Sequence, residues 1–258
     1  MLKHKYITVL CVSILVILSF LSFYSEVQWW IFPLFFMFWL GLTIWGSFDI
    51  RFGYFVKTYC NNPKVKDRKI AISFDDGPHE MTEKVLDLLQ KHHVKATFFC
   101  IGSQIEKHPE IFKRIIQEGH LVGNHTFTHT KSFGFLSAQK VVEEISRTNV
   151  IIERLSGKKV LFFRPPFGVT NPNVSKAISI TKHKVIGWNI RSLDTVIEEE
   201  AKILKRVKNK VVPGGIILLH DTSLKTVNVL EQLLLFLQSE NYDVITIDSL
   251  LKMPAYED

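Results

Sequence analysis

Apolar and polar positions divide the chain into two parts of different character. Residues 6–25 and 27–48 are uncharged runs of 20 and 22 residues, separated only by Glu26. A helix needs about 20 apolar residues to cross a bilayer. The pattern therefore predicts a membrane anchor over residues 1–48, made of two transmembrane helices over these runs with a tight turn between them.

From residue 69 onward, short apolar runs rich in β-branched and aromatic residues alternate with stripes of helical period. The predicted strands are Ile70–Phe74, Thr97–Ile101, His120–Asn124, Val160–Phe163, Val185–Trp188, Ile216–Leu219 and Val244–Ile247. Strands that alternate with helices predict a parallel sheet with crossover helices. We therefore expect an α/β domain over residues 69–258 with about seven parallel strands, and a basic linker over 49–68. The periodicity leaves open whether the sheet closes.

Charge changes this picture in one respect. The net charge is +7, but no nucleic-acid motif is present, so we expect no nucleic-acid partner. Instead, basic residues gather just after the second apolar run, where they would face anionic headgroups of membrane lipid. They are Arg51, Lys57, Lys64, Lys66, Arg68 and Lys69. The three cysteines form no CxxC pair and predict no disulfide framework.

Five short segments carry polar residue types that chemistry can use, and each comes at the end of a predicted strand or just after it. The segments are Ser73–Pro78, His125–His129, Arg164–Gly168, Trp188–Asp194 and Leu218–Asp221. In parallel α/β barrels the active site lies at the carboxyl ends of the strands. Two histidines and a carboxylate are ligands that suit a divalent transition metal with open coordination positions.

Each segment also has a purely structural interpretation. Asp76 and Gly77 form an ordinary turn dipeptide, and Asp221 is equally acceptable in a turn. Asp194 is a possible N-cap residue before Glu198, and Arg164 a possible strand-end cap. Only the order and common location of the five segments favour a site.

Together the five segments resemble the polysaccharide deacetylase family (NodB-homology domain), over about residues 69–247. The resemblance implies a distorted (β/α) barrel with fewer than eight units. It also implies a metal-dependent hydrolase with Asp76, His125 and His129 as metal ligands, Asp75 as general base and His220 as general acid. Zinc is the expected ion, with cobalt, manganese or nickel as alternatives.

The resemblance extends to the surroundings of these residues. It implies that Arg164 favours the ionised form of Asp75 and that Asp194 orients the ring of His220 and raises its pKa. It also implies that the backbone N–H of Phe167, next to Pro166, stabilises an oxyanion. Trp188 and Leu219 are expected to line a pocket for the acetyl methyl, although both also suit a core. Two positions depart from the family's common residues. Ser73 replaces a threonine, which is a mild change, whereas Thr195 replaces a tryptophan, and the missing indole leaves the substrate open.

We therefore expect a membrane-anchored hydrolase that removes N-acetyl groups from a glycan. The alternatives are a deformylase or deacetylase of a lipid-linked sugar, an O-acetyl esterase, and a sugar-binding protein without activity. Lys3 and Lys5 before the first run, with Arg51 after the second, favour a cytoplasmic domain by the positive-inside bias. The cell-wall substrates usual in the family favour the outside, and a single span would reconcile the two.

Overall fold

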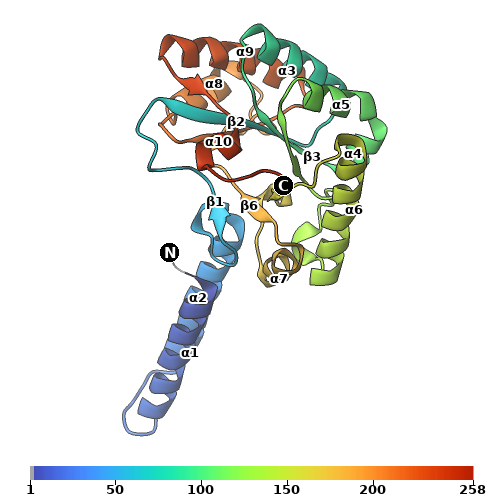
Figure 1. Cartoon of the computed structure of the whole chain (residues 1–258). Helices are drawn as coiled ribbons and strands as arrows, with labels where there is room; N and C mark the ends of the chain where they lie inside the picture. The colour runs from blue at the N-terminus through green and yellow to red at the C-terminus, as the bar shows by residue number, and fades with distance from the viewer. Residues whose placement is uncertain (1–2, 258) are drawn as a thin grey trace.

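An apolar helical hairpin precedes an α/β domain in the computed structural model, which describes residues 3–257 (Figure 1). The helices are α1 (His4–Leu21), α2 (Ile31–Phe48), α3 (Glu80–Lys91), α4 (Gly102–Lys107), α5 (Pro109–Gln117), α6 (Ala138–Ser156), α7 (Pro172–Thr181), α8 (Glu200–Lys208), α9 (Leu224–Ser239) and α10 (Ile247–Leu251). The 3₁₀ turns are η1 (Ile50–Phe52), η2 (Phe133–Phe135) and η3 (Pro166–Gly168). The strands are β1 (Thr58–Tyr59), β2 (Lys69–Asp75), β3 (Thr97–Cys100), β4 (Leu121–Asn124), β5 (Phe162–Phe163), β6 (Lys184–Ile186), β7 (Ile190–Arg191), β8 (Ile216–His220) and β9 (Asp243–Val244).

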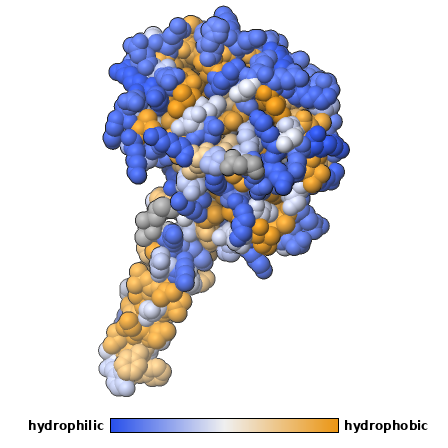
Figure 2. Space-filling view, viewed as in Figure 1, coloured by the Kyte–Doolittle hydropathy of each residue, from blue (hydrophilic) through white to orange (hydrophobic). Residues whose placement is uncertain are grey.

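Helices α1 and α2 project from the domain as a rod whose surface is hydrophobic along its length (Figure 2). By length and composition, both are suited to cross a membrane, although a helix near the N-terminus can also be a signal sequence. The first helix ends at Leu21, before the end of the predicted span 6–25, and the second begins at Ile31, after the start of 27–48. The turn between them is therefore longer than the sequence indicated.

The strands form one parallel sheet in the order β1-β6-β5-β4-β3-β2-β8-β7. Strand β9 lies off this path and pairs with the first two residues of β2. This arrangement confirms the predicted distorted barrel of parallel strands. The sheet has nine strands, two more than the seven predicted. The two additional strands are β1 and β7, which have two residues each and carry no apolar run that would mark a strand in the sequence. The last predicted strand, Val244–Ile247, is shorter than expected: β9 ends at Val244, and helix α10 begins at Ile247.

Strand β2 shows how the barrel divides its side chains between two faces. Ile70, Ile72 and Phe74 pack in one cluster with residues of the outer helices α3, α5 and α9. Ala71 instead packs in a second cluster, which contains Leu218 of the adjacent strand β8. Because side chains alternate along a strand, the carboxylate at the end of β2 shares the inner face with Ala71.

The segment predicted as a linker, 49–68, is partly built into the domain. It contributes β1, which pairs with β6, and Tyr54, whose ring packs against Gly46 of α2 so closely that a Cβ there would lie 2.5 Å away. The base of the hairpin is also joined to the domain by two backbone hydrogen bonds of 2.9 Å, from the His4 amide to the Tyr54 carbonyl and from the Thr170 amide to the Ser47 carbonyl.

Candidate active site

Two adjacent carboxylates at the end of β2 point to different partners. Asp75 ends the strand and is almost fully buried, whereas Asp76 has a φ of 76° and turns away from the strand direction. The turn is packed tightly from behind, because a Cβ on Gly77 would lie 2.3 Å from a carboxylate oxygen of Asp221. The local backbone thus separates the two carboxylates and leaves each free for its own contacts.

Asp76, His125 and His129 bring three ligand atoms together at the barrel rim. Asp76 Oδ1 lies 3.5 Å from His125 Nε2 and 3.4 Å from His129 Nε2. This oxygen is buried, and among residues 3–257 it has no hydrogen-bond partner. Burial alone would raise the pKa of Asp76, but the three nearby imidazoles, His125 first, lower it well below its usual range.

The donor atoms fit a divalent ion. All three ligand atoms lie within 4.8 Å of one another. Ligands about 2.1 Å from a tetrahedral zinc ion are separated by roughly 3.4 Å, close to the observed distances from Asp76. A buried carboxylate oxygen without a partner is costly unless a cation compensates it. Burial and the neighbouring His125 lower the pKa of His129 to about 4, which leaves its ring neutral, the form that binds metals.

Backbone and side-chain contacts fix the two histidines. His125 Nδ1 lies 2.6 Å from the carbonyl oxygen of Arg164, so it donates its proton there and leaves Nε2 facing Asp76. The loop that carries His129 is held by Glu144 of α6, which accepts hydrogen bonds from the amides of Phe127 and Thr128 at 3.0 and 2.7 Å. Glu144 could not be recognised from the sequence, because its position in the pattern of α6 is that of an ordinary surface residue.

The pairing expected between Arg164 and Asp75 is present in the barrel interior. Arg164 is fully buried, and its Nη1 donates to Asp75 Oδ1 at 2.7 Å and to Ser73 Oγ at 2.9 Å. The guanidinium also donates to the carbonyl oxygens of Ile186 and Gly187 at 3.2 and 3.0 Å. Asp75 is therefore held as a fixed carboxylate, with its second oxygen turned towards the cluster of histidines. Ser73, seen in the sequence only as a departure from threonine, is one of the groups that position Arg164.

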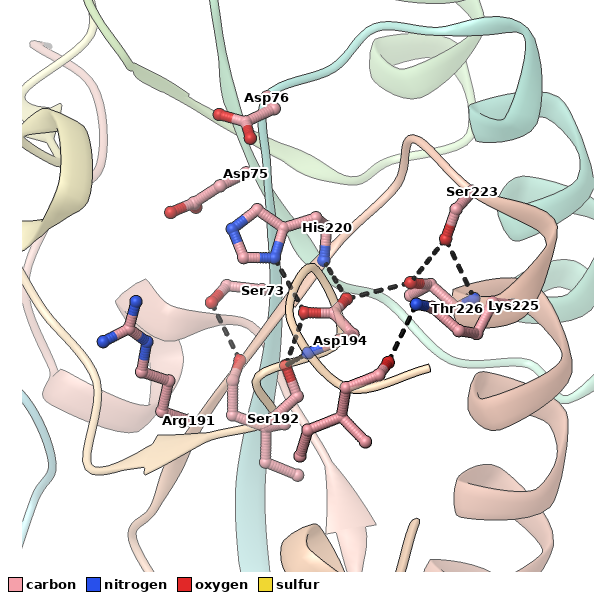
Figure 3. A network of polar contacts seen from close by, with 12 residues as sticks. Ser73, Asp75, Asp76, Arg191, Ser192, Asp194, His220, Ser223, Lys225 and Thr226 are labelled. Atoms are coloured by element: carbon pink, nitrogen blue, oxygen red, sulfur yellow. Dashed lines mark hydrogen bonds and ion pairs between the residues drawn. The ribbon is translucent and has the colours of Figure 1, made fainter. Parts of the chain in front are cut away.

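On the neighbouring strand, His220 is aligned with Asp75 in the β2–β8 register. Its Nδ1 lies 2.8 Å from Asp194 Oδ1, and its backbone amide donates to Asp194 Oδ2 at 2.8 Å. Figure 3 shows the ring between Asp194 on one side and Asp75 and Asp76 on the other. Burial alone would lower the pKa of His220, but the hydrogen bond and charge of Asp194, with those two carboxylates, raise it to about 9.

Asp194 is fixed by further contacts that the sequence did not reveal. Ser192 Oγ donates to Oδ1 at 2.7 Å, and Thr226 Oγ1 donates to Oδ2 at 2.9 Å (Figure 3). Asp194 does not cap α8, whose N-cap is Glu199. Thr195, the departure from the family's usual tryptophan, is exposed next to this network.

The loop after β5 carries Phe167, whose backbone amide was expected to stabilise an oxyanion. Pro166 is buried, and Phe167 has a φ of 58° with its ring centroid 4.8 Å from that of His129. Within residues 3–257 the Phe167 amide has no hydrogen-bond acceptor. An unpaired amide on a loop stiffened by two prolines, beside a histidine of the cluster, is a suitable donor to a bound oxygen.

The two residues expected to line a methyl pocket have different positions. Trp188 is buried on the inner side, and Arg164 lies over its ring at 5.4 Å from the centroid. Leu219 is fully buried in the cluster between the sheet and the outer helices. It therefore occupies the opposite face of β8 from His220, whereas Leu218 packs in the same cluster as Trp188. The inner-face leucine next to the site is thus Leu218.

Asp221 supports the site from behind. It is fully buried and accepts a hydrogen bond of 2.6 Å from Thr82 Oγ1. Burial is the main cause that raises the pKa of Asp221 to about 7. Its carboxylate lies so close to Gly77, in the turn after Asp76, that a Cβ on this glycine would be 2.3 Å from it.

Comparison with known proteins agrees with this geometry. A family model described as polysaccharide deacetylase matches residues 62–186. The peptidoglycan-N-acetylglucosamine deacetylase PgdA of Listeria monocytogenes is 36% identical over 193 residues, which cover 73% of this chain and 40% of that protein. The chain thus spans less than half the length of this relative.

Solved structures extend the comparison. The crystal structure of the Bc1960 peptidoglycan N-acetylglucosamine deacetylase superposes with a TM-score of 0.73 at 30% identity, covering 78% of this chain and 94% of that one. BA3943 of Bacillus anthracis, described as a CE4 family pseudoenzyme, superposes with a TM-score of 0.69 at 30% identity, covering 76% and 69%. Proteins of similar fold and sequence thus include both an active deacetylase and a pseudoenzyme. By sequence and by fold, this chain belongs to the polysaccharide deacetylase family.

Proposed function

We propose that the protein is a metal-dependent hydrolase that removes N-acetyl groups from the amino sugars of a glycan. The observation that carries the proposal is the arrangement of two ion pairs beside one cluster of ligands. Asp75, paired with Arg164, and His220, paired with Asp194, lie at the ends of the adjacent strands β2 and β8, next to Asp76, His125 and His129. A pseudoenzyme has no need of this complete set of coupled groups.

Asp76, His125 and His129 would hold a divalent ion, which supplies Lewis-acid activation of water and of the substrate carbonyl. Asp75 accepts a proton from the attacking water as the new C–O bond forms. The Phe167 amide donates to the carbonyl oxygen as that oxygen gains negative charge. His220, protonated at neutral pH, gives its proton to the sugar nitrogen as the C–N bond breaks. The products are acetate and the free amine.

A direct test is acetate release by the full chain, purified in detergent, from a panel of N-acetylated substrates. The panel contains N-acetylglucosamine oligomers and peptidoglycan, the substrate named for the relatives, together with an O-acetyl ester. Loss of acetyl mass from the amino sugars, abolished in Asp75→Asn, supports the proposal. His220→Ala should impair amide cleavage far more than ester cleavage, because an amine leaves poorly without a proton. Absence of turnover on every substrate would support a sugar-binding role instead.

We further propose that α1 and α2 anchor the domain, residues 69–258 with part of the preceding segment, in a membrane. Exposed apolar side chains cover both helices, and both ends of the hairpin are hydrogen-bonded to the domain. Two spans with both ends on one side agree with this geometry better than a single span. The Thr170–Ser47 hydrogen bond joins the end of α2 to a residue that comes just after the Phe167 loop. With α2 inserted in a membrane, the site would therefore lie near the membrane surface.

That position favours a second candidate substrate, a lipid-linked amino sugar. Lys3, Lys5 and Arg51 lie at the base of the hairpin, whereas Glu26 is the only charge in its distal turn, so the positive-inside bias places the domain in the cytoplasm. A peptidoglycan substrate requires the outside. Fusion of a reporter active only in the cytoplasm to the C-terminus, with an export-dependent reporter as control, distinguishes the two. Signal from the control alone would exclude the lipid-linked sugar at the inner leaflet.

A further inference from the structure

A cavity of about 440 Å³ lies where the end of α2 meets the domain. It is distinct from the ligand cluster, because none of Asp76, His125 and His129 lines it. Its lining residues come from the anchor, from the segment after β6 and from the end of α8. They are Trp45, Phe48, Asp49, Ile50, Arg51, Trp188, Asn189, Arg191, Leu193, Arg206 and Lys210.

The lining is strongly cationic. The lining contains four basic residues and one acidic residue, Asp49. The Asp49 carboxylate already accepts a hydrogen bond of 2.8 Å from Arg51 Nε. Among residues 3–257, no carboxylate lies within ion-pair distance of Arg191, Arg206 or Lys210. The cavity therefore holds three positive charges that the protein does not neutralise.

The polar partners within the cavity leave donors available. Arg206 uses Nε to donate to the Arg191 carbonyl at 3.0 Å, which fixes its side chain against the end of β7. The remaining guanidinium N–H groups of Arg206 have no acceptor among the described residues. Guanidinium groups present planar pairs of donors that match phosphate oxygens. The chemistry of the lining is thus suited to a phosphate group.

The position of the cavity indicates where such a phosphate comes from. Trp45 and Phe48 lie on the last turns of α2 and are 58% and 68% exposed. Aromatic side chains at the end of an apolar helix are typical of the membrane interface. With α2 inserted in a bilayer, the cationic lining would stand at the level of the lipid headgroups.

A second cavity at the base of the hairpin has the same character. Lys3, Lys5, Lys57 and Lys176 line it together with His4, and no carboxylate is among its lining residues. The base of the hairpin therefore carries excess positive charge in more than one place, as expected for a surface in contact with anionic lipid.

We infer that the cavity lined by Arg51, Arg191, Arg206 and Lys210 binds the phosphate headgroup of an anionic membrane lipid. The bound headgroup would fix the domain against the bilayer. It would also brace the segment from Trp188 to Asp194, whose last residue orients His220. The inference depends on insertion of the hairpin in a membrane but not on the hydrolase activity.

The test uses the full chain, freed of lipid in an uncharged detergent and examined by native mass spectrometry. Phosphatidylglycerol and phosphatidylcholine are added separately, and inorganic phosphate is added as a competitor. The expected result is retention of phosphatidylglycerol in preference to phosphatidylcholine, with little competition by an equal concentration of inorganic phosphate. Equal retention of the two lipids would overturn the inference, and so would full displacement by inorganic phosphate.

Matched variants on α8 and just after its end locate the site. Arg206→Gln combined with Lys210→Gln should weaken phosphatidylglycerol binding on the order of 30-fold, and Lys210→Gln alone by about fivefold, while leaving the Arg206–Arg191 hydrogen bond in the single variant. Lys202→Gln combined with Lys205→Gln removes the same charge from α8 at positions outside the cavity. If this control loses as much binding as the cavity variant, the effect is one of net charge and the assigned site is wrong.

Discussion

The pairing of Asp194 with His220 gives the most specific quantitative prediction. Asp194→Asn removes the negative charge next to the imidazole but keeps the size of the side chain and one of its two oxygens. Ser192 donates to Oδ1 and Thr226 to Oδ2, so the remaining oxygen can keep only one of these two hydrogen bonds. In the native protein the pKa of His220 is raised to about 9, although burial acts in the opposite direction. The variant loses the hydrogen bond and charge of Asp194, the largest causes that raise this pKa, so we expect the pKa to fall towards its ordinary value of 6.5.

The consequence appears as a pH dependence. His220 acts as an acid only while it is protonated, so activity is kept below its pKa and lost as the pH rises through it. At pH 8, a fall in the pKa from about 9 to 6.5 reduces the protonated fraction from about nine-tenths to roughly 3%, a loss of about 30-fold in kcat. At pH 6 most of the activity should remain.

The assay is kcat for amide hydrolysis between pH 5.5 and about 10, with metal content measured for each sample. The native enzyme should lose activity near pH 9, and Asp194→Asn near pH 6.5. Ser192→Ala serves as the matched control, because it removes one hydrogen bond to Asp194 but no charge. If kcat of Asp194→Asn falls at the same alkaline pH as kcat of the native enzyme, the assignment of His220 as the acid is refuted. An equal loss of kcat at every pH would indicate a structural defect instead.

Three further changes have definite expected outcomes. Asp75→Asn should keep its metal and lose about 10²–10⁴-fold in rate, whereas Asp76→Asn should lose the metal, as measured by elemental analysis; the reverse result would exchange their roles. Glu144→Gln should weaken metal affinity about 10–100-fold by loosening the loop of His129, with activity recovered at excess metal; unchanged affinity would contradict this role. Asp221→Asn should raise the melting temperature at pH 8 and raise it less at pH 5, because burial disfavours the charged form and the stability from the protonated form is lost as the pH rises from the ordinary pKa of 3.8 to about 7. A lower melting temperature at pH 8 would show that Asp221 is needed as a carboxylate.

The residue patterns were sufficient to predict the parallel sheet and the meeting of five segments at one rim. Strands such as β2 and β8 are long and nearly continuous in apolar residues, so burial on both faces marks them clearly. Because the carboxyl ends of parallel strands converge, Asp75 and His220 could be placed together although 145 positions separate their numbers. The elements that escaped prediction, β1 and β7, have two residues each and owe their conformation to pairing with neighbours.

Two features of the site depended on three-dimensional detail. Leu219 was expected in the pocket, but strand alternation turns it outward and brings Leu218 inward, a difference of one position that apolar runs do not specify. Glu144 holds the loop of His129 from a helix, where its pattern is that of any surface acid. The residues that carry reactive groups were therefore easier to recognise than those that hold them.

The central claim is that a divalent ion held by Asp76, His125 and His129 is required for removal of N-acetyl groups. The most direct measurement follows bound metal and acetate release from N-acetylglucosamine oligomers in the same samples of the full chain, before chelation, after chelation and after addition of zinc, cobalt, manganese or nickel. About one ion per chain should be lost and regained together with the activity, and His125→Ala should recover neither. Undiminished acetate release from protein with verified removal of its metal would contradict the account.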